Sequence, residues 1–499
     1  MKRVKIPAYT MKKMMKMSDN VITEALLADY ILEELTDAYK IGHWKQYPKN
    51  TRQVYSYLES RGGLFPATTF VGLQYYMKKY LAGKVITNES IDEAIADTDE
   101  VFGYRMFNEE GFRYIADELG GKLPIEIKAV PEGMTVPVQN VLLTITNTDP
   151  KAYWLPNYLE GLIEMIWYPI TVGTMSREIK KNIAYFAKIA GEEPSVVHLN
   201  NFGFRGSTSP EAAMIGDMAH LMNFWGSDTL PGKRGVNKYY HGKQDKTPTL
   251  LSVYAAEHST VTSYGEENEL FAYRELLRRV PADQIASIVI DSYDAMRAVD
   301  EYFGKDPELK YLVRVERTGK TVLRPDSGDP VEMSVKVLKS LWNNYGGTLN
   351  ANGYKVLDPH VGVIYGDYIS KDMINQILGQ VVGVHQFAPS NILFGMGGAL
   401  IQKVNRDTQS FAFKCSAVDI DGKWHEVYKH PVTDAKKKSK RGRMALVDMG
   451  NGHLETLPIG VTDPAKWKTP AVDILQTVFL NGDIMKDYTF DEVRANAAI

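Results

Sequence analysis

The stretch "VGVIYGD", residues 361–367, is one of four similar units in the sequence. In each unit a short apolar run rich in Val and Ile leads into a turn with Gly or Asp, and a longer segment with helical spacing follows. The other runs are "SIVI" before Asp291, "TVLR" before Pro325 and "NILF" before Gly395. The four runs end at residues 290, 324, 365 and 394, and separations of 34, 41 and 29 residues are typical of strand–helix units in a parallel sheet.

The acidic and glycine residues of these units fall where the expected strands end. Ligands of parallel α/β sheets bind beyond the carboxyl ends of the strands, so we expect a barrel-like α/β domain with its site on one face. An earlier unit fits the same scheme, because "SVVHL" (195–199) leads into a segment with helical spacing. In that segment Ser209 is expected to cap a helix, with Pro210 at its first position and Glu211 in its first turn.

The remaining parts of the chain predict a second domain. The segments "VYSYLES", "PIEIKAV" and "VLLTITN", all before about residue 165, alternate like antiparallel strands. Near the other end, "SFAFKCSAV" and "KWHEVYKH" are interpreted as strands joined by the hairpin-type turn "DIDG". We therefore expect a flexible extension over residues 1–20, a discontinuous α+β domain over 21–165 and 405–499, and the α/β barrel over 166–404.

Composition favours a globular enzyme over the other protein classes. The chain has 499 residues, 44% of them hydrophobic, and a formal net charge of -3, so it has no overall basic field for a nucleic-acid partner. Cys415 is the single cysteine, which excludes an intramolecular disulfide and indicates a reducing, cytoplasmic environment. No apolar run approaches the roughly 18 residues of a membrane span, and the basic, Met-rich start lacks the apolar segment of a secretory signal.

Two stretches suggest phosphate binding without establishing it. "TGKT" (318–321) resembles the end of a P-loop, but the glycine required five residues before Gly319 is replaced by Arg314, so a P-loop is rejected. The basic run "KKKSKRGR" (436–443) is interpreted first as a solvated loop, with anion binding as the alternative.

The turns at the strand ends are stronger candidates for ligand contacts. In "VLRPDSGDP" (322–330), Arg324 suits a phosphate and Asp326 suits sugar hydroxyls, although a plain turn with a surface arginine is an equal alternative. The glycines of "FGMGGAL" (394–400) would let backbone amides approach an anion, or would allow close helix–strand packing instead. With "YGD" (365–367) one strand earlier, they predict two adjacent amide-rich turns that form a phosphate cradle.

The stretch "YAAEHSTVTSYG" (254–265) contains a candidate nucleophile. His258 lies between Glu257 and the hydroxyls of Ser259 and Thr260. An isolated histidine is more often a structural residue. Here Glu257 is able to orient the ring and the hydroxyls are able to bind a group attached to it, which favours a nucleophilic or acid–base role.

Many segments, in order from about residue 35 to about residue 495, resemble the nicotinamide phosphoribosyltransferases of the nicotinate/nicotinamide family, which are type II phosphoribosyltransferases. They include "TDAYKIGHWKQYP", "VYSYLESR", "GLQYYMKKYL", "LPIEIKAVPEG", "FGFRG", "AAEHST", "DSYD", "RPDSG", "FGMGG", "QKVNRD", "FKCS" and "TVFLNG". The resemblance implies an irregular α/β barrel with a second, mainly antiparallel domain. It also implies homodimers in which each active site takes residues from the partner subunit.

The resemblance further implies the reaction. The phosphoribosyl group of phosphoribosyl pyrophosphate is transferred to nicotinamide, which gives nicotinamide mononucleotide and pyrophosphate in NAD salvage. ATP hydrolysis is coupled to this transfer through a phosphohistidine, here His258, with Asp291 facing its ring. Magnesium is expected to bind mostly through pyrophosphate or ATP oxygens and water, which agrees with a sequence that has no obvious protein cage for a metal.

The resemblance also assigns roles to single residues. Phe202 and the tyrosine at position 39, contributed by the second subunit, correspond to the aromatic pair around the pyridine ring. Arg205 and Asp228 correspond to residues beside the ring amide. Arg324 corresponds to a cation on the pyridine and phosphate side, and Asp326 to a carboxylate near the ribose hydroxyls. The remaining matches are the 5′-phosphate cradle of Gly366, Asp367, Gly397 and Gly398, and a pyrophosphate clamp from the second subunit formed by Arg61, Arg406 and Lys414.

Asp228 favours nicotinamide over its acid. A carboxylate accepts a hydrogen bond from the nicotinamide amide but repels the carboxylate of nicotinate. Two alternatives stay open from the sequence. One is specificity for nicotinate or quinolinate, and the other is a non-catalytic binding or signalling protein on the same scaffold.

Overall fold

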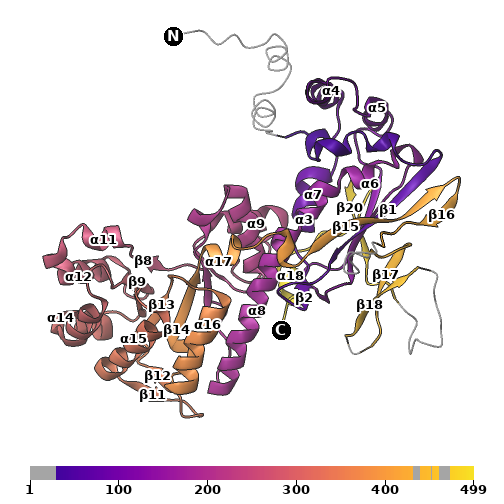
Figure 1. Ribbon diagram of the computed structural model, residues 1–499. Helices are drawn as coiled ribbons and strands as arrows, with labels where there is room; N and C mark the ends of the chain where they lie inside the picture. Colours follow the sequence, from indigo (N-terminus) through magenta and orange to yellow (C-terminus); the bar gives the residue numbers. More distant parts are fainter. Residues whose placement is uncertain (1–29, 431–438, 451, 460–471) are drawn as a thin grey trace, which may run out of the picture.

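The computed structural model describes residues 30–430, 439–450, 452–459 and 472–499. The expected flexible extension over residues 1–20 therefore lies outside the described residues. Figure 1 shows an elongated molecule of two lobes, one formed by the middle of the chain and the other by segments from both of its ends. Within the described residues, no helix is long and apolar enough to span a bilayer.

The middle of the chain forms a seven-stranded sheet in which all neighbouring strands are parallel. The strand order is β7–β6–β14–β13–β10–β9–β8. The four predicted runs form four adjacent strands of this sheet, which confirms the expected strand–helix units. The strands are β6 (Leu199–Asn201), β7 (Gly226–Ser227), β8 (Tyr254–Ala255), β9 (Ala286–Val289), β10 (Thr321–Arg324), β13 (Val361–Tyr365) and β14 (Ile392–Met396).

A short link joins the two edges of this sheet. The N–H of Leu251 donates to the carbonyl of Trp225 at 2.6 Å, and its carbonyl accepts from the N–H of Ser227 at 3.1 Å. Leu251 thus bridges to β7, and the next strand, β8, pairs with β9 at the opposite edge. The sheet therefore curls into an irregular α/β barrel, as expected from the sequence.

Helices outside the sheet follow the strands. The helix after β6 begins as predicted, because the hydroxyl of Ser209 accepts from the N–H of Ala212 at 3.0 Å, with Pro210 at the first helical position. The barrel helices are α9 (Pro210–Leu221), α10 (Leu230–Tyr239), α11 (His258–Thr262), α12 (Glu269–Arg279), α14 (Pro307–Tyr311), α15 (Pro330–Tyr345), α16 (Lys371–Leu378) and α17 (Gly398–Ile401).

The expected strand over residues 195–199 is wrong in its placement. The structure has a turn at 196–198, and β6 spans Leu199–Asn201. The cause is local, because the ring nitrogen Nδ1 of His198 accepts from the N–H of Ser195 at 2.9 Å. This bond closes the segment into a turn, and the strand starts at Leu199, three residues before Phe202.

The other lobe is built on a seven-stranded sheet with antiparallel pairing. Its order is β16–β15–β1–β5–β3–β19–β20. The central pairing of β1 with β15 joins residues 51–60 to residues 411–420, so the sheet combines both ends of the chain. The strands are β1 (Thr51–Ser60), β3 (Ile125–Ala129), β5 (Val141–Asn147), β15 (Phe411–Ile420), β16 (Lys423–Glu426), β19 (Gln476–Leu480) and β20 (Asp483–Ile484).

The "DIDG" hairpin is confirmed, since β15 pairs with β16 across Asp421 and Gly422, both of which have positive φ. The second strand is shorter than expected. It ends at Glu426, and beyond it the N–H of Lys429 donates to the hydroxyl of Ser439 at 2.8 Å instead of to β15. The domain limits at residues 165 and 405 stay a prediction.

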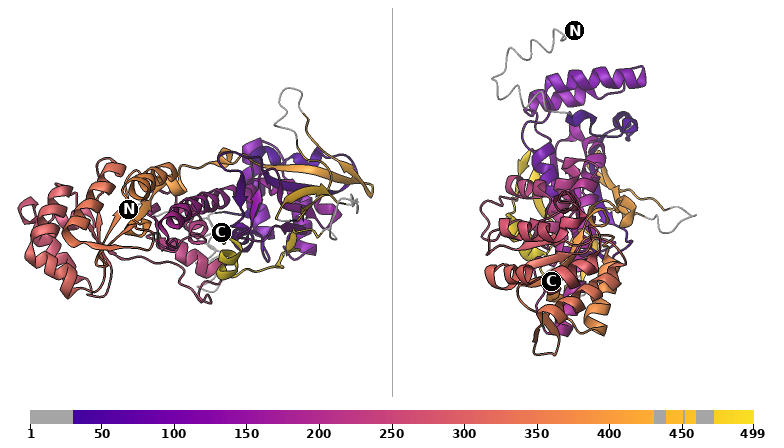
Figure 2. Two further views of the ribbon diagram at one scale, coloured as in Figure 1. Left: turned by 90° about the horizontal axis from the view of Figure 1, so that it is seen from below. Right: turned by 90° about the vertical axis from the view of Figure 1, so that its left-hand side faces the viewer.

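Helix α8 (Trp167–Ala190) lies between the lobes. It contacts β2 (Ala67–Thr69) in the antiparallel lobe and helices α9 and α16 of the barrel (Figure 2). The other helices and strands of the antiparallel lobe are α3 (Leu73–Tyr76), α4 (Asn88–Phe102), α5 (Glu109–Glu118), α6 (Leu155–Tyr158), α7 (Glu160–Glu164), β4 (Thr135–Pro137), β17 (Met444–Asp448) and β18 (Leu454–Pro458). The C-terminal helix α18 (Phe490–Asn496) bonds to both lobes.

Candidate active site

The carboxyl ends of the barrel strands bring most of the expected site residues to one mouth. Asp228 directly follows β7, Asp291 follows β9, and Arg324 is the last residue of β10. The two glycine turns follow the neighbouring strands β13 and β14, which confirms that they are adjacent. Arg205 lies in an exposed turn over Phe204–Gly206, four residues beyond the end of β6 at Asn201.

The ring of Phe202 lies at the centre of this mouth. A Cβ atom built on Gly395 would lie 2.0 Å from its Cε2 atom, so no larger residue fits beneath the ring. A Cβ on Gly366 would lie 3.4 Å from the same ring atom and 3.1 Å from Oδ1 of Asp326. The aromatic ring, the first glycine turn and the carboxylate expected near the ribose are therefore immediate neighbours.

The second glycine turn lies beside the backbone of Phe202. A Cβ on Gly397 would lie 3.5 Å from the carbonyl oxygen of Phe202, and a Cβ on Gly206 would lie 3.9 Å from the Cα of Gly398. Gly398 begins α17, with open space where its side chain would be. Backbone amides at this position are free to approach an anion.

Charged groups gather around Asp326. Burial raises the pKa of its carboxyl group, and the nearby negative charges of Asp291 and Asp367 raise it further. The positive charges of Arg324 and of protonated His258 lower it. All four expected catalytic residues therefore share one electrostatic environment.

His258 is held by Asp291. Its Nε2 atom lies 3.2 Å from Oδ1 of Asp291, whose side chain is only 4% exposed, whereas the imidazole is 47% exposed. A buried carboxylate keeps a proton on the nitrogen that faces it, which leaves the lone pair on Nδ1. His258 is also the first residue of α11, and its carbonyl accepts from the hydroxyl of Thr262 at 2.9 Å. The ring is thus fixed by its carboxylate and open to a reactant.

Asp228 is exposed at the mouth, and its position is fixed from two sides. Its N–H donates to the carbonyl of Asn201 at 3.0 Å, and its Oδ1 accepts from the hydroxyl of Ser252 at 2.5 Å. Burial and the charge of Asp228 together raise the pKa of the neighbouring Asp217 to about 7, although hydrogen bonds from Asn201 and Ser227 lower it. Asp217 and Ser252 were not among the expected site residues. Asp217 is detectable in the sequence as an acidic residue inside the apolar helical segment 212–219. No local sequence pattern indicates Ser252.

The expected pyrophosphate clamp forms a second group of residues, on the antiparallel lobe. The Nη1 atom of Arg406 lies 3.8 Å from Oε1 of Glu164. Burial raises the pKa of this glutamate, although the positive charges of Arg406 and Lys414 lower it in part. The Nε atom of Arg61 lies 3.2 Å from Oε1 of Glu59, and its backbone N–H donates to the carbonyl of Ser410 at 3.1 Å.

Tyr39 lies in the same lobe, in a short turn over Ala38–Lys40, and its side chain is 63% exposed. Among the described residues, no hydrogen bond or ion pair joins Tyr39, Arg61, Arg406 or Lys414 to the barrel mouth. The structure therefore brings the expected residues together in two groups, one on each lobe.

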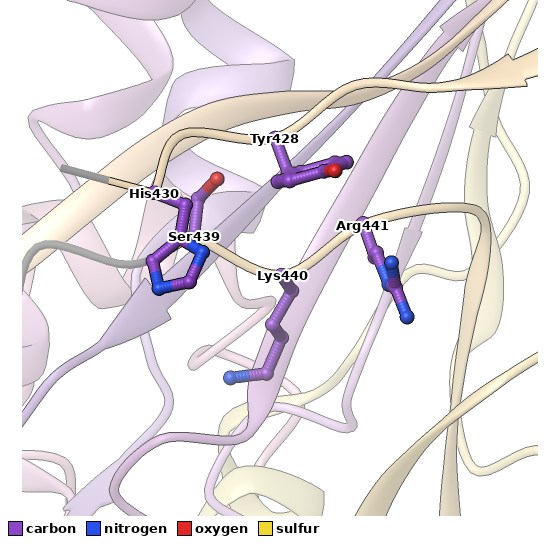
Figure 3. A pocket seen from close by; sticks show the side chains of 5 residues that line it. All are labelled: Tyr428, His430, Ser439, Lys440 and Arg441. Atoms are coloured by element: carbon purple, nitrogen blue, oxygen red, sulfur yellow. The ribbon is translucent and has the colours of Figure 1, made fainter. Parts of the chain in front are cut away.

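A pocket of about 410 Å³ lies beside the clamp group, lined by Tyr428, His430, Ser439, Lys440 and Arg441 (Figure 3). The Nζ atom of Lys440 lies 2.5 Å from Oε2 of Glu59, so this buried glutamate holds both Lys440 and Arg61. The pocket includes part of the basic run 436–443, of which residues 436–438 lie outside the described residues.

Over the described parts of the chain, no group of three or more His, Cys, Asp or Glu residues is arranged to hold a metal ion.

Comparison with known proteins agrees with this arrangement. The model of the nicotinate phosphoribosyltransferase (NAPRTase) family matches residues 197–483, and that of the nicotinamide phosphoribosyltransferase N-terminal domain matches residues 31–127. A nicotinamide phosphoribosyltransferase of Xanthomonas campestris pv. campestris is 43% identical over 472 residues, which cover 93% of this chain and 97% of the relative. A nicotinamide phosphoribosyltransferase of Mycoplasma pneumoniae is 33% identical over 442 residues, 82% of this chain and 94% of the relative.

Two solved structures share the fold. The nicotinate-nucleotide pyrophosphorylase of Pyrococcus furiosus superposes with a TM-score of 0.56 at 15% identity, over 100% of this chain and 97% of its own. Human nicotinic acid phosphoribosyltransferase gives a TM-score of 0.52 at 15% identity, over 93% of this chain and 92% of its own.

Proposed function

The chain belongs to the nicotinate and nicotinamide phosphoribosyltransferase family, and we propose that it transfers the phosphoribosyl group of phosphoribosyl pyrophosphate to nicotinamide, with ATP as co-substrate. The observation that carries this proposal is the meeting of Phe202, Asp326 and the two glycine turns at one barrel mouth. An aromatic surface, a carboxylate and a set of free backbone amides suit the base, the sugar and the phosphate of one nucleotide.

The pyridine ring would stack on Phe202, since a flat, electron-poor ring gains from contact with an aromatic face. Asp228 would accept a hydrogen bond from the amide nitrogen of nicotinamide. The hydroxyl of Ser252 already occupies one lone pair of Asp228, which orients the carboxylate but leaves its second oxygen for the ligand. Asp228 would repel the carboxylate of nicotinate, which favours nicotinamide as the substrate.

The reaction replaces the bond between the anomeric carbon and pyrophosphate with a bond to the pyridine nitrogen. Positive charge develops on the ribose ring as pyrophosphate leaves, and the carboxylates of Asp326 and Asp291 supply the opposite charge nearby. Arg324 offers a cation to the phosphate side, and the amides at residues 366–367 and 397–398 would hold the 5′-phosphate.

The mouth also fits magnesium. Carboxylate oxygens such as those of Asp326 and Asp367 are the donor type that this ion prefers, and most of its ligands would come from pyrophosphate oxygens and water. Bound magnesium would neutralise charge on the leaving pyrophosphate.

ATP would phosphorylate His258. The Nδ1 lone pair attacks the γ-phosphorus, the bond to the ADP oxygen breaks, and ADP leaves. The proton on Nε2 stays in the hydrogen bond to Asp291, which offsets the positive charge of the phosphorylated ring. Hydrolysis of this phosphohistidine would couple ATP to nucleotide formation.

A second copy of the chain would complete each site. The clamp group with Arg61, Arg406 and Lys414 lies on the lobe that does not carry the mouth, although pyrophosphate needs cations close to the ribose. Large apolar side chains are exposed close to the barrel mouth, among them Phe204, Leu230, Val253 and Tyr254. These features support a homodimer in which the clamp and Tyr39 of one subunit cover the mouth of the other.

A product assay tests the proposal. Purified protein, phosphoribosyl pyrophosphate, magnesium and either nicotinamide or nicotinate are incubated with and without ATP, and the nucleotides are separated by chromatography. We expect nicotinamide mononucleotide in both samples with nicotinamide, more of it with ATP, and little product from nicotinate. Absence of any nucleotide would favour a non-catalytic protein, and preferential use of nicotinate would contradict the substrate assignment.

A further inference from the structure

We propose that Asp217, a fully buried carboxylate in α9, is a positioning residue that fixes the two sides of the pyridine pocket, Phe202 and Asp228. The inference rests on the proposed function, because that function places nicotinamide between these two residues. Asp217 itself is covered by the protein and contacts no ligand.

One oxygen of Asp217 holds the ends of two neighbouring strands. Its Oδ1 accepts from Nδ2 of Asn201, the last residue of β6, at 2.7 Å. The same oxygen accepts from the hydroxyl of Ser227, the last residue of β7, also at 2.7 Å. Asn201 and Ser227 are paired directly across the parallel ladder.

Each of these two residues then fixes the turn that carries a pocket residue. Oδ1 of Asn201 accepts from the N–H of Gly203 at 2.8 Å, which fixes the backbone on the far side of Phe202. The hydroxyl of Ser227 accepts from the N–H of Thr229 at 2.9 Å, which fixes the backbone on the far side of Asp228. The relative position of the stacking ring and the amide-binding carboxylate therefore depends on a single shared acceptor.

Helix packing alone does not explain a carboxylate at this position. Its Oδ2 atom is buried and has no hydrogen-bond partner among the described residues, an arrangement that costs stability. A Cβ on Gly232 of α10 would lie 2.0 Å from this atom, so the neighbouring helix has a glycine where it passes the carboxylate. The two hydrogen bonds that Oδ1 accepts, from Asn201 and Ser227, explain why an acidic residue occupies this position.

Kinetics on variants separate this role from a general effect on folding. Asp217→Ala removes the shared acceptor, and we expect the KM for nicotinamide to rise at least about tenfold while the KM for phosphoribosyl pyrophosphate changes less than about threefold. Asp217→Asn keeps an oxygen acceptor, so its KM for nicotinamide is expected to stay within about threefold of the native value. Calorimetric titration with nicotinamide should show the same order of affinities.

Ser227→Ala gives a second test, which also serves if Asp217→Ala does not fold. This variant removes only the hydrogen bonds that connect Asp217 through Ser227 to the turn after Asp228. We therefore expect a smaller rise in the KM for nicotinamide than with Asp217→Ala. Added to Asp217→Ala, it should have little further effect, because both changes break the same connection.

Glu33→Ala is the matched control. Glu33 is also fully buried and lies in the antiparallel lobe. One of its oxygens accepts from the hydroxyl of Ser90, and the other has no partner among the described residues.

The outcomes are distinct. If the native protein forms no nicotinamide mononucleotide, the proposed function fails. If the native protein is active but the Asp217→Ala and Ser227→Ala variants keep the native KM for nicotinamide, the positioning role of Asp217 is wrong. It is also wrong if both KM values rise equally, or if Glu33→Ala reproduces the selective change.

Discussion

The Nε2 atom of His258 lies 3.2 Å from Oδ1 of Asp291, which pairs an accessible imidazole with a buried carboxylate at the edge of the barrel mouth. This geometry predicts that His258→Ala abolishes the stimulation of product formation by ATP and leaves a slow, ATP-independent transfer. The reason is that the contacts proposed for the base, the sugar and the 5′-phosphate do not involve the imidazole. Initial rates with and without ATP measure the effect. Equal stimulation of the variant and the native protein would contradict a phosphohistidine at this position.

Asp228 is expected to set the choice between the two pyridines. Asp228→Ser removes the carboxylate that would accept from the amide and repel an acid. We expect the kcat/KM for nicotinamide to fall by about tenfold or more and discrimination against nicotinate to relax. Steady-state assays with both substrates measure the ratio. An unchanged preference would show that another residue recognises the amide.

Gly395 is expected to control the position of the stacking ring. In Gly395→Ala, the new methyl group would lie 2.0 Å from Cε2 of Phe202, so the ring must move toward the ligand. We expect a KM for nicotinamide raised by about tenfold with a smaller change in the KM for phosphoribosyl pyrophosphate. Gly353→Ala is a control for adding a methyl group elsewhere, because open space surrounds that loop glycine, although its positive φ costs some stability.

Asp217 is expected to make stability fall as the pH rises. Burial raises the pKa of its carboxyl group from 3.8 to about 7 in the folded protein. Between these values the unfolded chain loses a proton that the folded protein keeps, so the free energy of unfolding falls and then levels off above pH 7 at a cost of roughly 4 kcal/mol.

Asp217→Asn removes this ionisation. The Tm of the variant relative to the native protein should therefore be higher at about pH 8 than at about pH 5, as measured by thermal unfolding in matched buffers. The same Tm difference at both values would mean that Asp217 does not titrate in this range.

Much of the fold could be predicted from the sequence because its signals are local. Apolar runs that end in Gly or Asp turns predict four strands of the parallel sheet and the adjacency of the two glycine turns. The cap at Ser209 and the hairpin turn at residues 421–422 depend on residues close together in the sequence, and the structure confirms both predictions. The strand near residue 195 was misplaced because the bond from Ser195 to His198 competes with the apolar pattern.

The candidate site was only partly predictable. The turns with Arg324, Asp326 and the glycines follow strand ends and are visible in the sequence. Asp217 and Ser252 depend on contacts between strands far apart in the chain, so local patterns do not show their partners. The proposed roles of Tyr39, Arg61, Arg406 and Lys414 rest on resemblance alone, since those roles would depend on a second subunit.

Complementation between two inactive variants tests most directly whether each site combines the mouth of one subunit with the clamp of another. Asp326→Ala damages the mouth and Arg406→Ala damages the clamp, and each variant alone is expected to be nearly inactive. Unfolded, mixed in equal amounts and refolded together, or co-expressed, they should form mixed dimers with one intact site. Such a mixture should regain about a quarter of the native activity, because about half of the dimers are mixed and each has one of two sites. Mixed dimers that form but show no gain over the separate variants would contradict the shared site.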